Sequence, residues 1–226
     1  VDRAAPCPQR AQDCLAWDDF ERADGPIDDA PSGQTWVTTS LSCATCRPVF
    51  SIRDGRALMS PSAEDISIWL AMVDTGRATG LEVSATITLS PTPLRANVGL
   101  VALFVDRDNH LTCKLEMSEG HPDGLITIGE QLGGRTTSLL AERDGIGLRS
   151  GSAYRLAITV PRTPSEHPIS CTVSGSGLGQ KTVSLMPSGE SIAAYGDGTA
   201  QGLRIKIFND EDDGRSTWDD FLVRPI

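Results

Sequence analysis

Short runs of alternating apolar and polar residues dominate this chain. The clearest run spans residues 81–89, where every second residue from Leu81 to Leu89 is apolar and the residues between them are polar. Successive side chains of a β-strand point to opposite faces, so this period of two predicts a strand with one buried and one solvated face. Residues 63–72 could form a short helical turn, and no other segment keeps a helical period.

A hairpin is predicted in the middle of the chain. Residues 98–105 are apolar apart from Gly99, as expected of a strand covered on both faces. Residues 106–109 form a polar turn into 110–117, where apolar residues again share one phase. Further strands are expected at 15–20, 35–39, 125–128, 154–160, 169–173, 203–208 and 222–224. This pattern predicts an all-β fold, an antiparallel two-sheet β-sandwich of the jelly-roll type.

The tetrapeptide Trp-Asp-Asp-Phe occurs twice, at residues 17–20 and 218–221. We expect the two copies to form neighbouring strands that close one β-domain. Alternation places Asp18 on the face of Phe20, and Asp219 on the face of Phe221. If the two Phe side chains are core anchors, each carboxylate needs a partner, which could be backbone N–H groups, an Arg or a Ca²⁺ ion.

Composition limits the domain organisation and the partners. The 226 residues, with 22 Gly and 14 Pro, suit one turn-rich sandwich domain over residues 15–226, preceded by an irregular cysteine-bearing arm at 1–14. The formal net charge of −10 argues against nucleic acid or an anionic membrane as a partner. No run approaches the roughly 18 apolar residues of a membrane span.

Several segments resemble the concanavalin A-like lectin/glucanase superfamily, in its laminin-G-like and phage tail-protein branches. The resemblance begins with Asp-Phe-Glu-Arg-Ala-Asp-Gly at 19–25, followed by Ser-Gly-Gln-Thr-Trp at 32–36. It continues at 50–57, 99–109, 151–156 and 218–223. The chain is similar to domains of minor tail and other surface proteins of actinobacterial phages. The resemblance implies a concanavalin A-like jelly roll, a fold that hosts glycanases, lectins, adhesion modules and structural virion domains.

The motifs of the superfamily's enzymes are absent from the sequence. A retaining glucanase of this kind carries Glu-x-Asp-x-x-Glu on one strand face, whereas Glu116 and Glu119 have no Asp between them. The three His residues lack zinc-site spacing, and no Gly-x-Ser-x-Gly occurs. We therefore predict a protein that is not an enzyme. The alternative is a secreted hydrolase or lyase of the same superfamily that uses Glu116, Glu119 and Asp123.

The six cysteines form two groups. Cys113 and Cys171 are in phase with apolar neighbours, so we expect them to be buried free thiols unless their strands are adjacent. Cys7, Cys14, Cys43 and Cys46 lie outside the expected strands and could form disulfides or a zinc site. Disulfides are favoured over zinc because of the spacing of Cys7 and Cys14. Six residues separate them, whereas about two to four residues separate paired cysteine ligands in structural zinc sites.

Candidate ligand sites are few. The acidic loop at 209–214 contains Asp210 and Asp212, which with Asp18 and Asp219 are candidate Ca²⁺ ligands; a solvated turn is the alternative. Asp106, Asp108 and Asn109 allow the same two interpretations. Trp36, Trp69 and Tyr195 are candidates for stacking on a sugar, and filling the core is the alternative role.

Together these observations predict a non-catalytic module of a virion surface or tail, at the virion surface or outside the cell. Its role would be structural, with host-envelope carbohydrate as the candidate ligand. The expected partners are other virion proteins, contacted through the N-terminal arm, and a cell-surface glycan.

Overall fold

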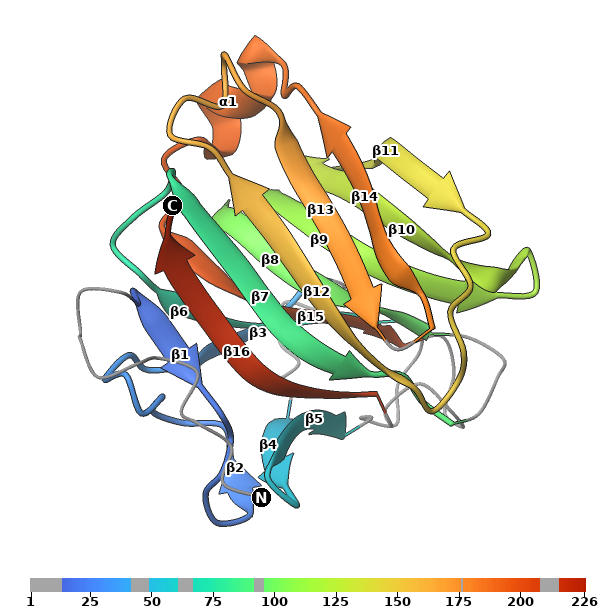
Figure 1. Cartoon of the computed structure of the whole chain (residues 1–226). Helices are drawn as coiled ribbons and strands as arrows, with labels where there is room; N and C mark the ends of the chain where they lie inside the picture. Colours follow the sequence, from blue (N-terminus) through green and yellow to red (C-terminus); the bar gives the residue numbers. More distant parts are fainter. Residues whose placement is uncertain (1–13, 42–48, 61–66, 92–95, 176, 208–215) are drawn as a thin grey trace.

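The computed structural model describes residues 14–41, 49–60, 67–91, 96–175, 177–207 and 216–226, and these form two antiparallel β-sheets packed face to face (Figure 1). The all-β sandwich predicted from the alternation is confirmed. The first sheet has the strand order β14 (Gly179–Leu185), β13 (Ile169–Gly175), β12 (Ala153–Val160), β7 (Leu81–Thr88), β16 (Thr217–Pro225), β5 (Arg56–Ser60), β4 (Val49–Arg53) and β2 (Gly25–Pro26), with β1 (Ala16–Asp18) also paired to β16.

The second sheet has seven strands among the described residues. Its order is β11 (Arg135–Asp144), β10 (His121–Leu132), β9 (Asn109–Ser118), β8 (Ala96–Asp106), β15 (Ala200–Ile207), β6 (Ser67–Asp74) and β3 (Val37–Ser40). In Figure 1 the green strands β8, β9 and β10 lie behind β12 and β13 of the first sheet. Neither sheet order follows the sequence, so strands far apart in the chain become neighbours.

The core lies between the two sheets and follows the predicted alternation. Val83 and Ile87 of β7 are fully buried, and so are Leu111 and Leu115 of β9 on the facing sheet. Polar residues of the opposite phase point away from this core, as Thr86 and Thr88 do in β7. One apolar layer therefore holds both sheets together, as expected for a sandwich.

The two Trp-Asp-Asp-Phe copies lie side by side, because β1 pairs with β16 and Asp18 faces Phe221 in the register. Phe20 and Phe221 are both fully buried, which confirms them as core anchors. The copies are nevertheless not equivalent. Trp17 is half-buried, whereas Trp218 is fully buried in the core.

A β-bulge in β16 explains this difference. The register between β16 and β7 shifts between Asp219 and Leu222, and Asp220 has φ +51°. The extra residue places Trp218 and Phe221 on the same inner face, while Asp219 pairs with the outward-facing Thr86. The prediction that Asp219 shares the face of Phe221 is therefore wrong, because strict alternation does not hold across a bulge.

Two segments differ from the sequence expectation. The described part of the segment expected to form a helical turn, residues 67–72, belongs to the strand β6. The helix α1 (Gly189–Tyr195) was not expected; it begins after Ser188, whose side chain caps the N–H of Ser191. No helix in the described part of the chain is long and apolar enough to cross a membrane.

A disulfide joins the two sheets. Cys113 of β9 and Cys171 of β13 are bonded, with their Cα atoms 5.6 Å apart. The expectation of buried free thiols is therefore wrong, and the alternative of a bridge between adjacent strands is correct, with the two strands facing each other from different sheets. Cys14 is also disulfide-bonded. Cys7, Cys43 and Cys46, the other members of the predicted disulfide or zinc group, lie outside the described residues.

Candidate functional site

The outer face of the seven-stranded sheet carries a group of polar side chains that the core does not use. In β9 the inward residues are apolar, so the intervening Thr112, Lys114 and Glu116 project outward. Their neighbours on adjacent strands complete a surface that we call the polar patch: Asn97, Thr112, Lys114, Glu116, Thr127 and Arg204. It lies on four adjacent strands, β10, β9, β8 and β15.

Gly99 lies at the centre of the polar patch. It pairs with Lys114 of β9 on one side and with Arg204 of β15 on the other. Adjacent strands are about 4.8 Å apart, so two long cationic side chains flank a backbone segment that has no side chain of its own. A Cβ atom at Gly99 would lie 2.2 Å from the Cys113 carbonyl oxygen, so glycine is required for the close approach of the two strands.

A chain of hydrogen bonds orders one half of the patch. The Nη1 of Arg204 donates to the Oδ1 of Asn97, and the Nδ2 of Asn97 donates to Glu116 Oε2 at 2.8 Å. Arg204 is buried, and desolvation lowers its pKa to about 10, although the nearby Glu116 opposes this change. The Asn97 amide thus links a buried cation to a half-buried carboxylate.

Lys114 forms the other half of the patch. Burial lowers its pKa to about 7; the charges of Arg204 and Lys206 add to this effect, and Glu116 opposes it. Its Nζ lies over Gly129 of β10, since a Cβ atom added to Gly129 would be 3.4 Å from this nitrogen. At neutral pH the side-chain amine of Lys114 is therefore only partly protonated.

Thr127 lies beside Lys114 in the register between β10 and β9. Its side chain is 1% exposed, and the Oγ1 atom has no hydrogen-bond partner within the described structure. The neighbouring Thr112 is satisfied differently, because its Oγ1 donates to the carbonyl oxygen of Gly129 at 3.0 Å. A buried hydroxyl without a partner costs free energy, so the patch has an unmet polar group beside Lys114.

An apolar strip adjoins the polar patch on the same face. Leu70, Met72 and Val101 form a second hydrophobic cluster, against which Phe104 packs. The buried His110 lies next to this strip, with its ring 5.5 Å from that of Phe104. Desolvation lowers the pKa of His110 to about 4, so its imidazole is neutral at physiological pH. Leu70, Met72 and Val101 are themselves buried, so the apolar side chains that this face presents beside its charged groups are the partly buried ones packed against them, among them Ile68 and Phe104.

A separate depression lies beside α1. This helix contacts β8 and β9 at one end of the sandwich (Figure 1). The depression has a volume of about 480 Å³ and is lined by Asn109, Leu132, Gly133, Arg135, Glu190 and Ala194. Beneath α1, the hydroxyl groups of Tyr195 and Ser191 donate to Glu130 Oε2 at 2.7 and 2.8 Å. These bonds fix α1 to β10, so this region has a clear structural role.

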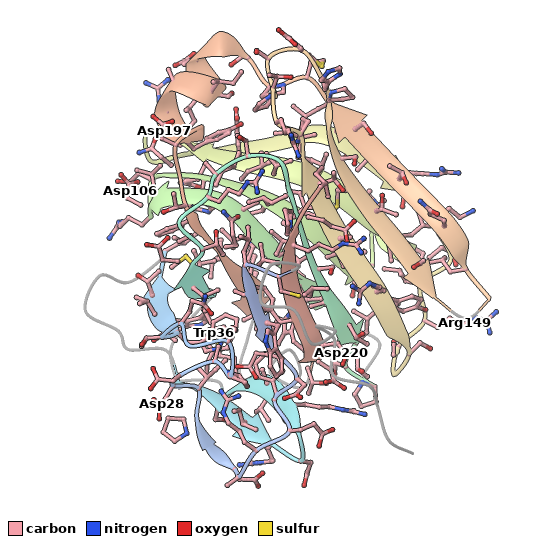
Figure 2. All side chains as sticks on the ribbon, turned by 60° about the vertical axis from the view of Figure 1, so that its left-hand side comes forward. Asp28, Trp36, Asp106, Arg149, Asp197 and Asp220 are labelled. Atoms are coloured by element: carbon pink, nitrogen blue, oxygen red, sulfur yellow. A yellow bond between two sulfur atoms is a disulfide. The ribbon has the colours of Figure 1, made fainter. Side chains whose placement is uncertain are left out.

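The aromatic residues proposed to stack on a sugar do not lie on the surface. Trp36, Trp69 and Tyr195 are 5%, 1% and 1% exposed, respectively. Trp36, labelled in Figure 2 near the N-terminal strands, packs against Phe221 with 5.0 Å between the ring centroids. Their assignment as an exposed sugar platform is therefore wrong. The alternative interpretation, that they fill the core, agrees with the structure.

The proposed Ca²⁺ ligands divide into three cases. Asp18 is buried and accepts hydrogen bonds from the N–H of Phe20 at 2.8 Å, Arg22 Nη1 at 2.6 Å and Trp36 Nε1 at 2.8 Å. These donors occupy both carboxylate oxygens of Asp18. Of the partners expected for this carboxylate, the structure therefore provides a backbone N–H group and an Arg. Asp219 accepts from the N–H of Asp220 at 2.9 Å. Asp210 and Asp212 lie outside the described residues.

In the turn before β9 a carboxylate also accepts local hydrogen bonds. Asp106 accepts from the N–H of Asp108 and from the Asn109 amide, which closes the turn. Among the described residues no group of three or more His, Cys, Asp or Glu side chains could hold a metal ion. A structural Ca²⁺ therefore remains a prediction for the acidic loop at 209–214.

The carboxylates proposed for an enzyme are not brought together. Glu116 is engaged with Asn97 on the outer face, whereas Glu119 and Asp123 are exposed in the β9–β10 hairpin. The sequence analysis missed Lys114, Asn97 and Arg204. The outward phase of Lys114 and Arg204 on predicted strands was available as a signal, whereas Asn97 lies just before the expected strand at 98–105. Only strand order reveals that three separate strands bring these residues together.

No family model matches the chain, and no curated protein matches it. Solved structures do resemble it. The Ca²⁺-bound exoplasmic/lumenal domain of VIP36 has a TM-score of 0.59 at 10% identity, over 96% of this chain and 91% of that one. Lectin UEA-II in complex with galactose has a TM-score of 0.58 at 10% identity, over 89% and 98%.

The GH43 protein BlXynB from Bacillus licheniformis is similar over 99% of this chain, with a TM-score of 0.58 and 16% identity. This chain spans only 42% of the length of BlXynB. The carbohydrate-binding module CBM66 from Bacillus subtilis has a TM-score of 0.51 at 10% identity, over 83% and 94%. At these identities the likeness concerns the fold, which is that of a lectin-like β-sandwich.

Proposed function

We propose that this chain is a non-catalytic carbohydrate-binding module that holds a glycan on the outer face of its seven-stranded sheet. The observation that carries the proposal is the hydrogen-bonded series Arg204, Asn97 and Glu116 beside an apolar strip. Sugars present hydroxyl groups at their edges and C–H groups on their faces. Fixed donors and acceptors beside the partly buried apolar side chains of the strip, such as Ile68 and Phe104, suit both, as small-molecule sites generally do.

The placement of carboxylates supports a non-catalytic role. Glycosidases of the common type use two carboxyl groups, about 5 to 10 Å apart, on either side of the scissile bond. Among the six residues that define the polar patch, Glu116 supplies the one carboxylate, and it accepts a hydrogen bond from the Asn97 amide. Glu119 and Asp123 belong to the exposed hairpin and are not part of the patch. A binding role is thus favoured over hydrolysis.

The structural neighbours support a glycan as the ligand class. One neighbouring structure is a lectin complexed with galactose, another is VIP36 in its Ca²⁺/Man3GlcNAc-bound form, and a third is a carbohydrate-binding module. Placement on a virion surface, with contacts to other virion proteins, rests on the sequence resemblance to phage tail domains. The Ca²⁺-bound form of VIP36 supports the proposal of a structural Ca²⁺, for which Asp210 and Asp212 are the candidate ligands.

A glycan array with the purified chain tests this proposal, with and without EDTA. We expect binding to a defined set of glycans, and its loss in Asn97→Ala, which removes the link between Arg204 and Glu116. Thr182→Ala is the matched control, because Thr182 is exposed on β14 of the other sheet. Thermal unfolding must show that both variants fold. No binding by the wild-type chain, or shortening of a bound polysaccharide, would contradict a non-catalytic binding module.

Virion placement has its own test. Mass spectrometry of purified phage particles that encode the chain should detect it in the particle. Its absence from particles would overturn that part of the proposal while leaving glycan binding untouched.

A further inference from the structure

We infer that the depression beside α1 is a second binding site, which takes a small zwitterion: a free amino acid, or a short peptide with both an ammonium group and a carboxylate. In this arrangement Arg135 binds the carboxylate and Glu190 binds the ammonium group. None of the residues that line the depression belongs to the polar patch. The inference therefore goes beyond the proposed glycan-binding function and does not depend on it.

One wall of the depression is the tip of the β10–β11 hairpin. Gly133 and Gly134 have φ +57° and +75°, values that glycine adopts without strain, and they join the two strands in a two-residue turn. Leu132 and Arg135 flank this turn and are directly paired in the register. Paired residues of antiparallel strands lie on the same face of a sheet, so both side chains line the depression.

A second wall is one face of α1. Glu190 and Ala194 are four residues apart, and this spacing places them one above the other on the helix. The adjoining face carries Ser191 and Tyr195, which donate to Glu130 and hold the helix in place. Each wall thus contributes one charged and one apolar side chain, and the two charges have opposite signs.

Hydrogen bonds fix the hairpin wall, so the depression is preformed. The N–H of Gly133 donates to Asn109 Oδ1 at 3.1 Å, and Asn109 Nδ2 donates to Asp106 at 2.9 Å, which ties the hairpin tip to the turn before β9. In Figure 2 Asp106, in that turn, and Asp197, just after α1, lie at the same end of the molecule. The volume of about 480 Å³ is within the range of roughly 300 to 1,000 Å³ typical of small-molecule sites.

Arg135 and Glu190 line this depression without pairing with each other. No ion pair joins them, and neither side chain bonds to another residue in the part of the chain that the structure describes. Each therefore keeps its hydrogen-bonding groups for a ligand, N–H donors on Arg135 and acceptor oxygens on Glu190. A neutral sugar would use neither charge, and a ligand with one charge would use only one. A zwitterion uses both, and its carbon atoms can contact Leu132 and Ala194.

NMR titrations of the isotope-labelled full chain with four probes test the inference. The probes are leucine, the dipeptide alanyl-leucine, N-acetylleucine, which lacks the ammonium charge, and leucinamide, which lacks the carboxylate charge. We expect saturable shifts of the backbone amides of Gly133, Gly134 and Ala194 with leucine or with the dipeptide. Each blocked derivative should bind about fivefold more weakly than leucine, the size expected for charge-assisted hydrogen bonds at a solvent-exposed site.

Two substitutions assign each ligand charge to its partner. Arg135→Gln should remove the preference for leucine over leucinamide and keep the preference over N-acetylleucine, whereas Glu190→Gln should do the reverse. A merely structural role would weaken all four probes alike. Arg143→Gln and Glu142→Gln are the matched controls and should change nothing. Both residues are exposed on β11, roughly 20 Å along the strand from Arg135.

The outcomes decide between the ligand classes. Tighter binding of leucine supports a site for free amino acids, and tighter binding of alanyl-leucine supports a site for peptide ends; both results support the inference. Equal binding of leucine, N-acetylleucine and leucinamide would overturn the zwitterion as the ligand. No shifts around the depression with any probe at millimolar concentration would overturn the site itself. Neither negative result bears on glycan binding at the polar patch, which the glycan array tests separately.

Discussion

The indole nitrogen of Trp36 donates a 2.8 Å hydrogen bond to the buried carboxylate of Asp18. Asp18 belongs to the first Trp-Asp-Asp-Phe copy, and its other oxygen accepts from Arg22. In the second copy the bulge turns Asp219 toward the opposite face. The same four residues therefore provide a polar anchor at one end of the chain and a core tryptophan at the other.

Asp18→Asn should lower the free energy of unfolding by about 3 kcal/mol, because it leaves Arg22 without its charge partner and disturbs the bond to Trp36. Arg22 is 29% exposed, so solvent screens part of this loss. Urea unfolding followed by tryptophan fluorescence measures it. Asp19→Asn is the control, since the bond that Asp19 accepts from the N–H of Glu21 is local and exposed. Equal effects of the two substitutions would contradict the role of Asp18.

Removing the disulfide between the sheets should cost about 4 kcal/mol, from the chain entropy of a loop closed over a sequence separation of 58 residues. The double variant Cys113→Ala with Cys171→Ala can be compared with the wild-type protein in guanidinium unfolding. An unchanged midpoint would show that the sheets are held by the apolar core alone.

His110 should make the protein sensitive to acid. Its pKa is about 4 in the folded state and 6.5 in the unfolded chain, so the unfolded state binds more protons between these values. The free energy of unfolding should consequently fall as the pH decreases from 6.5 to 4. His110→Phe keeps an aromatic ring beside Phe104 and should remove this part of the pH dependence. Parallel pH profiles for the two proteins would rule out the buried neutral imidazole.

Lys114 should make the free energy of unfolding depend on pH in a higher pH range than His110 does. Its pKa falls from 10.5 to about 7 on folding, so the free energy of unfolding should rise with pH from about 7 upward. The charged groups that act on it are Glu116, Arg204 and Lys206. Arg204, with a pKa of about 10, begins to add a rise in the same direction near that pH.

Lys114→Met isolates the contribution of the lysine. We expect this variant to be more stable than the wild-type protein at pH 6, with a difference that shrinks as the pH rises from 7 to 9. Thermal unfolding across this range, with Lys181→Met as the control, provides the measurement. A constant difference across the range would contradict the lowered pKa.

The sequence predicted the two-sheet sandwich well, because alternation is a local property. Residues 81–89 and the hairpin at 98–117 were readable from their own phase, and the repeated tetrapeptide indicated the pairing of β1 with β16. The bulge was not predictable in this way. The positive φ of Asp220 depends on how β16 packs on β7, which four residues do not encode.

The candidate site was harder to predict than the fold, because its residues come from separate strands. Lys114 and Arg204 are 90 positions apart, yet each pairs with Gly99. Alternation indicates that both side chains point outward. It does not show that β9 and β15 are the two neighbours of β8, because that depends on the order of strands in the sheet. The disulfide was missed for the same reason, since Cys113 and Cys171 belong to facing sheets.

The most direct test of the central claim is an NMR titration of isotope-labelled protein with a glycan that it binds on the array. Glycan binding on the outer face of the seven-stranded sheet predicts saturable shifts of the backbone amides of Gly99, Gly129 and Gly202, and of their neighbours in β8, β9, β10 and β15. The amides of β13 and β14 in the other sheet should remain unchanged. Shifts confined to β12, β13 and β14, or no shifts at saturating ligand, would contradict the account.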